Sequence, residues 1–365
     1  MLLLIDGQRI GDTYEVERYL GEGAFAEVYR VRHRFLGRHA LKVFKAPGMT
    51  PQETEDMLGE AIILSRIGHP NIVRVFNADV LELDTGTHGF FTMEYVPGGS
   101  LDRYWRSYKE RLMPVPEVVE VMRQVSSGIA VAHAEDPPIV HRDIKPQNIL
   151  VGYDGAGLRV RISDFGLAKR VNPLTLLATS RGTLGFKPPE SFENMDSCAA
   201  DVWALGTTLY LLLTDALPFP ALDERDISDA KRFLRPFRPA SLYNIQVDVA
   251  LDAIVARCLA VNSQDRYSHA GALLADLQRW QPGLAKETVQ AQGSTSKGTK
   301  DVLGVGSPAD RTQADDLVTE ALRLAKEPGK LMLAADMLED AISKHPDLRE
   351  KYESQLKLWR RGVSM

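Results

Sequence analysis

A dense group of polar side chains stands in the segment VHRDIKPQNILV, residues 140 to 151. Asp143 could accept the proton of an attacking hydroxyl, Lys145 could neutralise developing charge, and Asn148 could ligate a metal ion. The later segment SDFGLAK adds Asp164, a second oxygen ligand beside a glycine that permits an unusual backbone turn. Each side chain alone could be a solvated loop charge, but their order and spacing together predict in-line phosphoryl transfer.

Two features nearer the N-terminus could bind phosphate groups. The segment GEGAFAEV places Gly21 and Gly23 between two strand-like runs, in a turn whose backbone N–H groups could approach phosphate oxygens. Lys42 lies inside the apolar run ALKVF, where an ammonium is costly unless an anion pairs with it, and Glu60 is the candidate partner. The alternatives are an ordinary glycine-rich turn and a purely structural salt bridge.

The elements that must position these residues change in type along the chain. Residues 11 to about 95 contain short β-branched or aromatic runs separated by turn residues, which predicts strands. One helix, from about 50 to 67, interrupts them, because the segment TPQE combines a cap residue, a proline and an early acid. From about 100 to 280, apolar residues recur at three- and four-residue intervals, which predicts helices. A β-rich half therefore precedes an α-rich half.

Composition narrows the class of protein. The chain has 365 residues, 44% of them hydrophobic, and its formal net charge of −5 gives no reason to expect a nucleic acid or an anionic membrane as partner. Cys198 and Cys258 lie far apart, so we expect reduced thiols rather than a disulfide framework or a zinc site. The start MLLLI lacks the features of a signal peptide, and the longest apolar tract is too short to cross a membrane. We therefore expect a cytoplasmic protein without a membrane span.

The motifs together resemble those of protein kinases of the eukaryotic type, a family that includes the Hanks-like serine/threonine kinases of bacteria. The resemblance extends over about residues 12 to 280 and implies an α+β, two-lobed fold with ATP in the cleft between the lobes. The kinase domain would span residues 1–282, with a β-rich N-lobe over about 11–96 and an α-rich C-lobe over about 97–282. ATP and Mg²⁺ would be the cofactors, and Mn²⁺ could replace Mg²⁺.

The resemblance also implies roles for individual side chains. Those for the transfer step are a catalytic base (Asp143), a γ-phosphate contact (Lys145), two metal ligands (Asn148 and Asp164) and a Lys42–Glu60 pair that holds the α- and β-phosphates. Those around the nucleotide are a phosphate-covering loop, apolar walls, a gatekeeper and a hinge, formed by Leu20, Gly21, Gly23, Val28, Ala40, Lys42, Met93, Glu94, Tyr95, Val96 and Leu150. Structural roles are implied for Asp201 as an anchor of the catalytic loop, for a Glu190–Arg266 pair, and for His141, Phe165 and Leu64 as core residues.

Lys145 and Thr183 indicate the acceptor, because in the serine/threonine branch such a lysine and threonine bind each other and the base. We therefore expect protein serine or threonine, and we regard small-molecule kinases as the weaker alternative. Thr179 and Thr175 are the expected phosphorylation sites, since a phosphate on this segment could bind Arg142 beside the base. A segment held in place by packing of its leucines, without modification, is the alternative.

The C-terminal part differs in composition from the rest. Residues 283–312 are rich in glycine, serine, threonine and lysine, which predicts a flexible linker. Residues 313–365 show two helical patterns around a Pro-Gly turn and then a third, and they resemble one tetratricopeptide-like unit with a capping helix. One such unit cannot bury a core alone, so it should pack on the kinase domain, on a copy of itself or on a partner.

Two functions follow from this pattern. The first is an active serine/threonine protein kinase in signalling that phosphorylates protein substrates and its own activation loop. The alternative is a nucleotide-binding, pseudokinase-like scaffold whose helical tail recruits partners. The presence of every catalytic group favours the first. The sequence departs from the family pattern at Ala26, in the glycine-rich segment GEGAFAEV, and at Pro188, in the segment GTLGFKPPE that resembles the end of an activation loop. Neither departure removes a catalytic atom.

Overall fold

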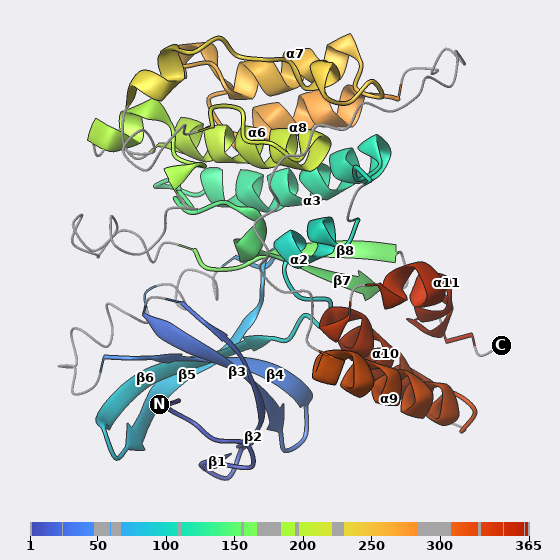
Figure 1. Ribbon diagram of the computed structural model, residues 1–365. Coiled ribbons are helices and arrows are strands. Elements are labelled where there is room, and N and C mark those ends of the chain that lie inside the picture. The colour runs from blue at the N-terminus through green and yellow to red at the C-terminus, as the bar shows by residue number, and fades with distance from the viewer. Residues whose placement is uncertain are drawn as a thin grey trace.

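The computed structural model describes residues 2–23, 25–46, 59, 67–108, 111–154, 157–165, 184–193, 197–220, 230–282, 308–327, 330–345, 347–360 and 362–363. One lobe holds a large sheet, a second lobe is mainly helical, and three C-terminal helices lie beside the junction of the two (Figure 1). The predicted order, a β-rich lobe followed by an α-rich lobe, is confirmed. None of the helices in the described ranges is long and apolar enough to cross a membrane.

A six-stranded antiparallel sheet with the strand order β1-β2-β3-β4-β6-β5 forms the N-lobe. Side chains alternate between its two faces, so Leu41 and Val43 join one apolar cluster while Ala40 and Phe44 join another. Lys42 therefore shares a face with Ala40, as its position in the run ALKVF predicts. The strands are β1 (Arg9–Ile10), β2 (Tyr14–Glu22), β3 (Ala26–His33), β4 (Gly37–Phe44), β5 (Val75–Leu83) and β6 (Gly86–Glu94).

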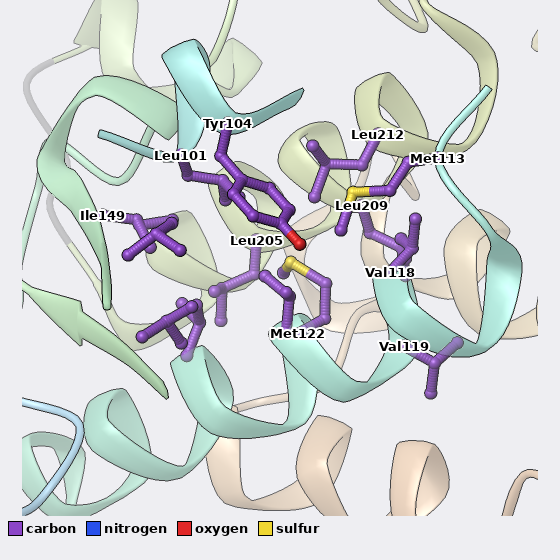
Figure 2. Packing of buried hydrophobic residues seen from close by; sticks show 14 of the residues in the cluster. Leu101, Tyr104, Met113, Val118, Val119, Met122, Ile149, Leu205, Leu209 and Leu212 are labelled. Atoms are coloured by element: carbon purple, nitrogen blue, oxygen red, sulfur yellow. The ribbon is translucent and has the colours of Figure 1, made fainter. Parts of the chain in front are cut away.

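Helix α3 (Val115–His133) lies at the centre of the C-lobe and packs against α6 (Cys198–Thr214) and α8 (Ala270–Arg279). Apolar residues recur along α3 at three- and four-residue intervals, and they are buried in one large core. Figure 2 shows Tyr104, Met122 and Leu205 converging in this core from three different helices. Helix α2 (Leu101–Arg106) supplies Tyr104, and α7 (Val249–Cys258) packs on α6.

A two-stranded hairpin and several short 3₁₀ helices complete the C-lobe. Strands β7 (Ile149–Asp154) and β8 (Gly157–Ile162) form the hairpin, and the end of β8 is tied to the segment before β5: the N–H of Val73 donates to the carbonyl of Ile162 over 2.9 Å. The hairpin therefore lies at the junction of the lobes. The 3₁₀ helices are η1 (Pro146–Asn148), η3 (Pro189–Glu193), η5 (Ala230–Leu234), η6 (Ala240–Leu242) and η7 (Ser263–Asp265).

Three helices form the tail: α9 (Pro308–Leu324), α10 (Leu331–Lys344) and α11 (Leu348–Arg360). The two helical patterns predicted around the Pro-Gly turn form α9 and α10, which pack on each other and bury Ala321, Leu324, Ala334 and Leu338 in one cluster. Helix α9 starts at Pro308, so residues 308–312 are helical although the sequence predicts them to be part of a linker over 283–312; residues 283–307 lie outside the described residues. The helix predicted over about 50 to 67 lies outside the described residues except for Gly59, which is helical, and Ile67, which is not.

Candidate active site

The loop before β7 brings three of the predicted side chains together. Asn148 donates its amide N–H to the backbone carbonyl of Asp143 over 2.8 Å and to the Asp143 carboxylate over 2.9 Å. The Lys145 ammonium lies 2.9 Å from the same carboxylate. The one-turn 3₁₀ helix η1 makes this possible, because it turns the chain between Lys145 and Asn148. The carboxylate is thus held from two sides, and its side chain keeps 27% of its surface exposed.

Asp201, in the first turn of α6, holds this loop through hydrogen bonds to its backbone. Its two carboxylate oxygens accept the backbone N–H groups of His141 at 2.7 Å and Arg142 at 2.8 Å, and His133 lies 3.0 Å away. Arg142 has a φ of 69°, in the left-handed region that non-glycine residues seldom adopt. The anchoring role expected of Asp201 is present in the structure, and the bonds hold the loop in a conformation that it would otherwise avoid.

Asp164 stands opposite this loop and forms an ion pair with Lys42. Burial alone would raise the pKa of Asp164, but the Lys42 ammonium and the Ser163 hydroxyl together hold that pKa below its usual range. Lys42 is almost fully buried beside the ring of Phe91, so the carboxylate also satisfies a costly buried charge. The sequence predicts Glu60 as the partner of Lys42. Glu60 lies outside the described residues, and the partner in the described part of the chain is Asp164.

The residues on this side fit a hard divalent cation. The Ser163 hydroxyl lies 3.1 Å from both the backbone carbonyl of Asn148 and the Asp164 carboxylate, so this hydroxyl connects the two residues predicted as metal ligands. Carboxylate and amide oxygens are the ligands that Mg²⁺ prefers, usually only one or two from the protein. Over the described ranges, no group of three or more His, Cys, Asp or Glu side chains forms a larger metal centre.

The predicted nucleotide walls form one apolar cluster. Val28, Ala40, Met93, Tyr95 and Leu150 belong to it, and they come from both lobes. Strand pairing explains part of this grouping, since the β3–β4–β6 register aligns each of these strands with the next.

The remaining predicted nucleotide contacts are not members of that cluster. Leu20 is 39% exposed, whereas Val96 is buried. The N–H of Gly23 donates to the carbonyl of Ala26 over 2.8 Å, which closes the glycine-rich turn whose first member is Gly21. Glu94 pairs with Arg161 at 2.8 Å, and burial raises the pKa of Glu94 although Arg161 acts in the opposite direction.

The loop that carries Asp143 borders a small pocket beside α6. Lys187 donates from its ammonium to the carbonyl of Arg142 over 2.6 Å, a contact that nothing in the sequence pattern predicts. The predicted Glu190–Arg266 pair is present and bidentate, with one bond of 2.8 Å. The pocket is lined by Val140, Arg142, Asp143, Ile144, Phe186, Lys187, Pro188, Ser191, Ala200, Asp201 and Ala204.

Of the other residues singled out from the sequence, some are described by the structure and some lie outside the described ranges. The rings of His141 and Phe165 are fully buried with centroids 4.5 Å apart, and burial lowers the pKa of His141, which suits the core role expected of both. The residues that lie outside the described ranges are Leu64, Thr175, Thr179 and Thr183. Chemistry and spacing do not single out Ser163 in the sequence, and the only signal for it is its place directly before Asp164.

Comparison with known proteins places these features in a family context. The family described as protein kinase domain matches residues 14–277. Serine/threonine-protein kinase ATG1a of Arabidopsis thaliana is 33% identical over 59% of this chain and 33% of its own length. PknB of Mycobacterium leprae is 29% identical over 76% of this chain and 44% of its own length. PknH of Mycobacterium tuberculosis is 34% identical over 71% of this chain and 40% of its own length. This chain thus matches less than half the length of these relatives.

Solved structures agree with the fold. The crystal structure of the PknI kinase domain of Mycobacterium tuberculosis has a TM-score of 0.55 and 26% sequence identity to this chain. The match covers 98% of that domain and 75% of this chain. The predicted two-lobed kinase architecture is therefore confirmed.

Proposed function

This chain belongs to the protein kinase family, and on that basis we propose that it transfers the γ-phosphate of ATP to serine or threonine hydroxyls of proteins. The observation that carries the proposal is the Asp143 carboxylate held between Lys145 and Asn148, opposite the Lys42–Asp164 pair. The relatives named as serine/threonine-protein kinases support the choice of acceptor.

Each side chain has a distinct part in the proposed reaction. ATP supplies the phosphoryl group, and a divalent cation neutralises its charge. Asp143 orients the acceptor hydroxyl and takes its proton, while Lys145 places a positive charge beside that carboxylate. Asn148 and Asp164 would hold the metal, for which Mg²⁺ is proposed and Mn²⁺ is an acceptable substitute. Lys42 would turn from Asp164 toward the phosphates, with Glu60 proposed as its partner.

The nucleotide is proposed to bind against the apolar cluster. Met93 would be the gatekeeper, and the backbone of residues 94 to 96 would meet the adenine. The glycine turn at Gly21 and Gly23 would cover the phosphates, and the burial of Ala40 and Met93 supports an apolar face for the base.

Control by phosphorylation is a further part of the proposal. Thr183 would contact the base, and Thr179, with Thr175 as second choice, would be phosphorylated. The position of Arg142 supports this, because Arg142 directly precedes Asp143 and lines a pocket together with Phe186 and Lys187, which follow the segment in the chain. Mass spectrometry of protein incubated with ATP and Mg²⁺, beside a Thr179→Ala variant, tests it; full activity with an unmodified segment would refute it.

The tail is proposed to be a single tetratricopeptide-like unit. Its antiparallel helix pair α9–α10 and the following helix α11 support that description. We propose that residues 313–365 bind a partner or a second copy of the chain. The location of the protein is a separate prediction: we expect the cytoplasm, where ATP is available.

The alternative function is a scaffold that binds nucleotide without transferring phosphate. The test is to incubate the full chain with labelled ATP, Mg²⁺ and a generic protein substrate, and then to identify the phosphorylated amino acids. Phosphoserine or phosphothreonine supports the kinase. Nucleotide that binds but leaves no label on any protein would favour the scaffold.

A further inference from the structure

A single buried carboxylate connects the tail to the N-lobe. Asp340 of α10 is 2% exposed, and it accepts hydrogen bonds from Arg30 and, over 3.0 Å, from the hydroxyl of Tyr95. Arg18 lies 3.4 Å and Arg38 3.6 Å from the same carboxylate. Three guanidiniums and a phenol therefore surround one side chain that is more than 240 residues away from any of them in the sequence.

These partners lie on the elements that form the nucleotide site. Arg18 is on β2, which leads into the glycine turn, and Arg30 is on β3. Tyr95 directly follows β6, in the segment proposed to meet the adenine. Burial alone would lower the pKa of Arg30, but Asp340, Tyr95 and Glu17 raise it, so the Asp340 carboxylate offsets the cost of burying this guanidinium.

The tail also contacts the C-lobe, through side chains of α11. The Arg349 guanidinium of α11 lies 3.6 Å from the ring centroid of Tyr104 and donates to the Tyr104 carbonyl over 3.2 Å. Tyr153 donates to Glu353 over 3.1 Å. Tyr104 is on α2, the first helix of the C-lobe, and Tyr153 is on β7, the strand that begins directly after Asn148. The C-lobe contacts are thus also made to elements that carry the site.

Between these two contacts, α10 packs on the chain that joins the lobes. A Cβ atom at Gly98 would lie 2.3 Å from the carbonyl oxygen of Val151 and 3.6 Å from the Glu339 carboxylate. Glycine is therefore needed at position 98, because the connecting segment is enclosed by β7 on one side and α10 on the other. Figure 1 shows α10 and α11 beside this junction.

We propose that α10 and α11 brace the two lobes across their connection, and that Asp340 is a positioning residue for nucleotide binding. Asp340 holds Tyr95 and β2 against α10, while Glu353 holds β7 against α11, so the walls of the nucleotide site from the two lobes keep their spacing. This inference rests on the proposed function in that it takes the site between the lobes to bind ATP. Release of the tail should then weaken nucleotide binding even though no tail residue belongs to the proposed site.

The test uses the full chain with the substitution Asp340→Asn, which removes the charge and keeps the shape. We expect the Kd for ATP with Mg²⁺, measured by calorimetric titration, to rise by about fivefold or more, since coupling between sites of this kind is typically of that size. Hydrogen exchange in α10 should accelerate in the same variant. Glu320→Gln is the matched control, because Glu320 makes an exposed ion pair with Arg323 on the same tail; its Kd should equal that of the parent.

Two further variants keep the result interpretable if Asp340→Asn folds poorly. Arg349→Gln loosens the brace from the C-lobe side and should raise the Kd in the same way. Tyr95→Phe removes only one hydroxyl, and its effect should not add to that of Asp340→Asn, because both substitutions break the same contact. A merely structural tail would lower the melting temperature in these variants and leave the Kd unchanged.

The outcomes separate this inference from the proposed function. A Kd that stays at the parent value while hydrogen exchange shows α10 released would overturn the brace, as would an α10 that remains protected in Asp340→Asn. A parent that binds ATP but transfers no phosphate would refute the proposed function alone, because nucleotide affinity can still be compared among the variants.

Discussion

Asp164 combines an unfavourable backbone conformation with a paired charge. Its φ of 63° lies in the left-handed region, which costs a residue other than glycine of the order of 1–3 kcal/mol. The ion pair with Lys42 and the contact with Ser163 hold it there. Such over-determined strain is characteristic of functional positions, and here it directs a carboxylate toward the loop that carries Asp143.

The first prediction concerns this carboxylate. Asp164→Asn should reduce the rate of phosphoryl transfer by about a thousandfold, because a metal ligand is worth several kcal/mol of transition-state stabilisation. Asparagine tolerates a positive φ, so the fold should persist. Asp154→Asn is the control, since Asp154 pairs with Arg159 in the β7–β8 hairpin and is not among the residues proposed to hold the metal. Transfer by Asp164→Asn at nearly the parent rate would remove Asp164 from the site.

A second prediction at this scale concerns pH. Burial raises the pKa of Glu339 to about 7, with Asp336 and Asp340 adding to the rise and Arg360 opposing it. The folded protein therefore retains a proton that the unfolded chain releases near its ordinary pKa of 4.5, so stability should fall as pH rises from about 4.5 to about 7.

Urea unfolding of the parent at several pH values measures this effect, which should not exceed about 3 kcal/mol. Glu339→Gln should lose that part of the pH dependence and be the more stable protein at about pH 8. Parallel curves for the two proteins would show that Glu339 does not titrate in this window.

Single residues were predictable where a motif carries them. Asp143, Lys145, Asn148 and Asp164 could be found because their chemistry and spacing in the chain are both specific. Asp340 could not, because it stands in an ordinary helical pattern and its partners are set by how the tail packs. Interactions between distant segments leave no periodic signal in the sequence.

At the scale of elements, the close approach of α6 and α7 decides how the C-lobe supports the catalytic loop. Helix α6 begins at Cys198 and carries Asp201, so any shift of α6 also shifts the anchor of the loop. The helices can approach because Gly206 faces Cys258: a Cβ atom at Gly206 would lie 2.3 Å from the Cβ of Cys258.

The third prediction follows from that contact. Gly206→Ala should destabilise the protein by about 1–3 kcal/mol, even though alanine favours a helix, because the overpacking must be relieved by moving one helix. Chemical unfolding measures the change. Gly68→Ala is the control, since Gly68 is exposed and a Cβ atom there would meet nothing within 4 Å. Equal stability of Gly206→Ala and the parent would show that the helices separate at little cost.

Element types were predictable and some boundaries were not. The strands of the N-lobe and helix α3 follow the periods of two and three to four residues on which their predictions rest. The start of α9 at Pro308 was missed because the segment around it is dominated by small and polar residues. Its helical state depends on packing further along α9, which local composition does not encode.

At the scale of the whole molecule, the kinase lobes and the tail share buried surface. Tail side chains such as Leu338, Leu356 and Trp359 belong to the same apolar cluster as the core of the C-lobe. The sequence left three choices for the tail: packing on the kinase domain, on a second copy or on a partner. It could not choose among them, because an apolar helix face looks the same whatever covers it. The structure has the first arrangement.

The fourth prediction tests whether the two kinase lobes fold and bind ATP without the tail. A chain that ends at Pro282 should still fold and bind ATP, because the strand pairing of the sheet and the packing of α3 on α6 and α8 are made entirely within it, although it loses the tail side chains that join the apolar core. Its Kd for ATP should be raised at least as much as that of Asp340→Asn. Size-exclusion chromatography and calorimetric titration check both points, and an insoluble or unfolded product would mean that the tail completes the core.

The central claim is that Asp143 serves phosphoryl transfer to protein hydroxyls, and one comparison tests it most directly. The Kd of each protein for ATP is first measured by titration. The parent and Asp143→Asn are then each incubated with saturating labelled ATP, Mg²⁺ and a protein substrate. We predict phosphoserine or phosphothreonine with the parent and a rate lower by about a hundredfold or more with Asp143→Asn. Equal rates for the two proteins, or no transfer by the parent, would contradict the claim.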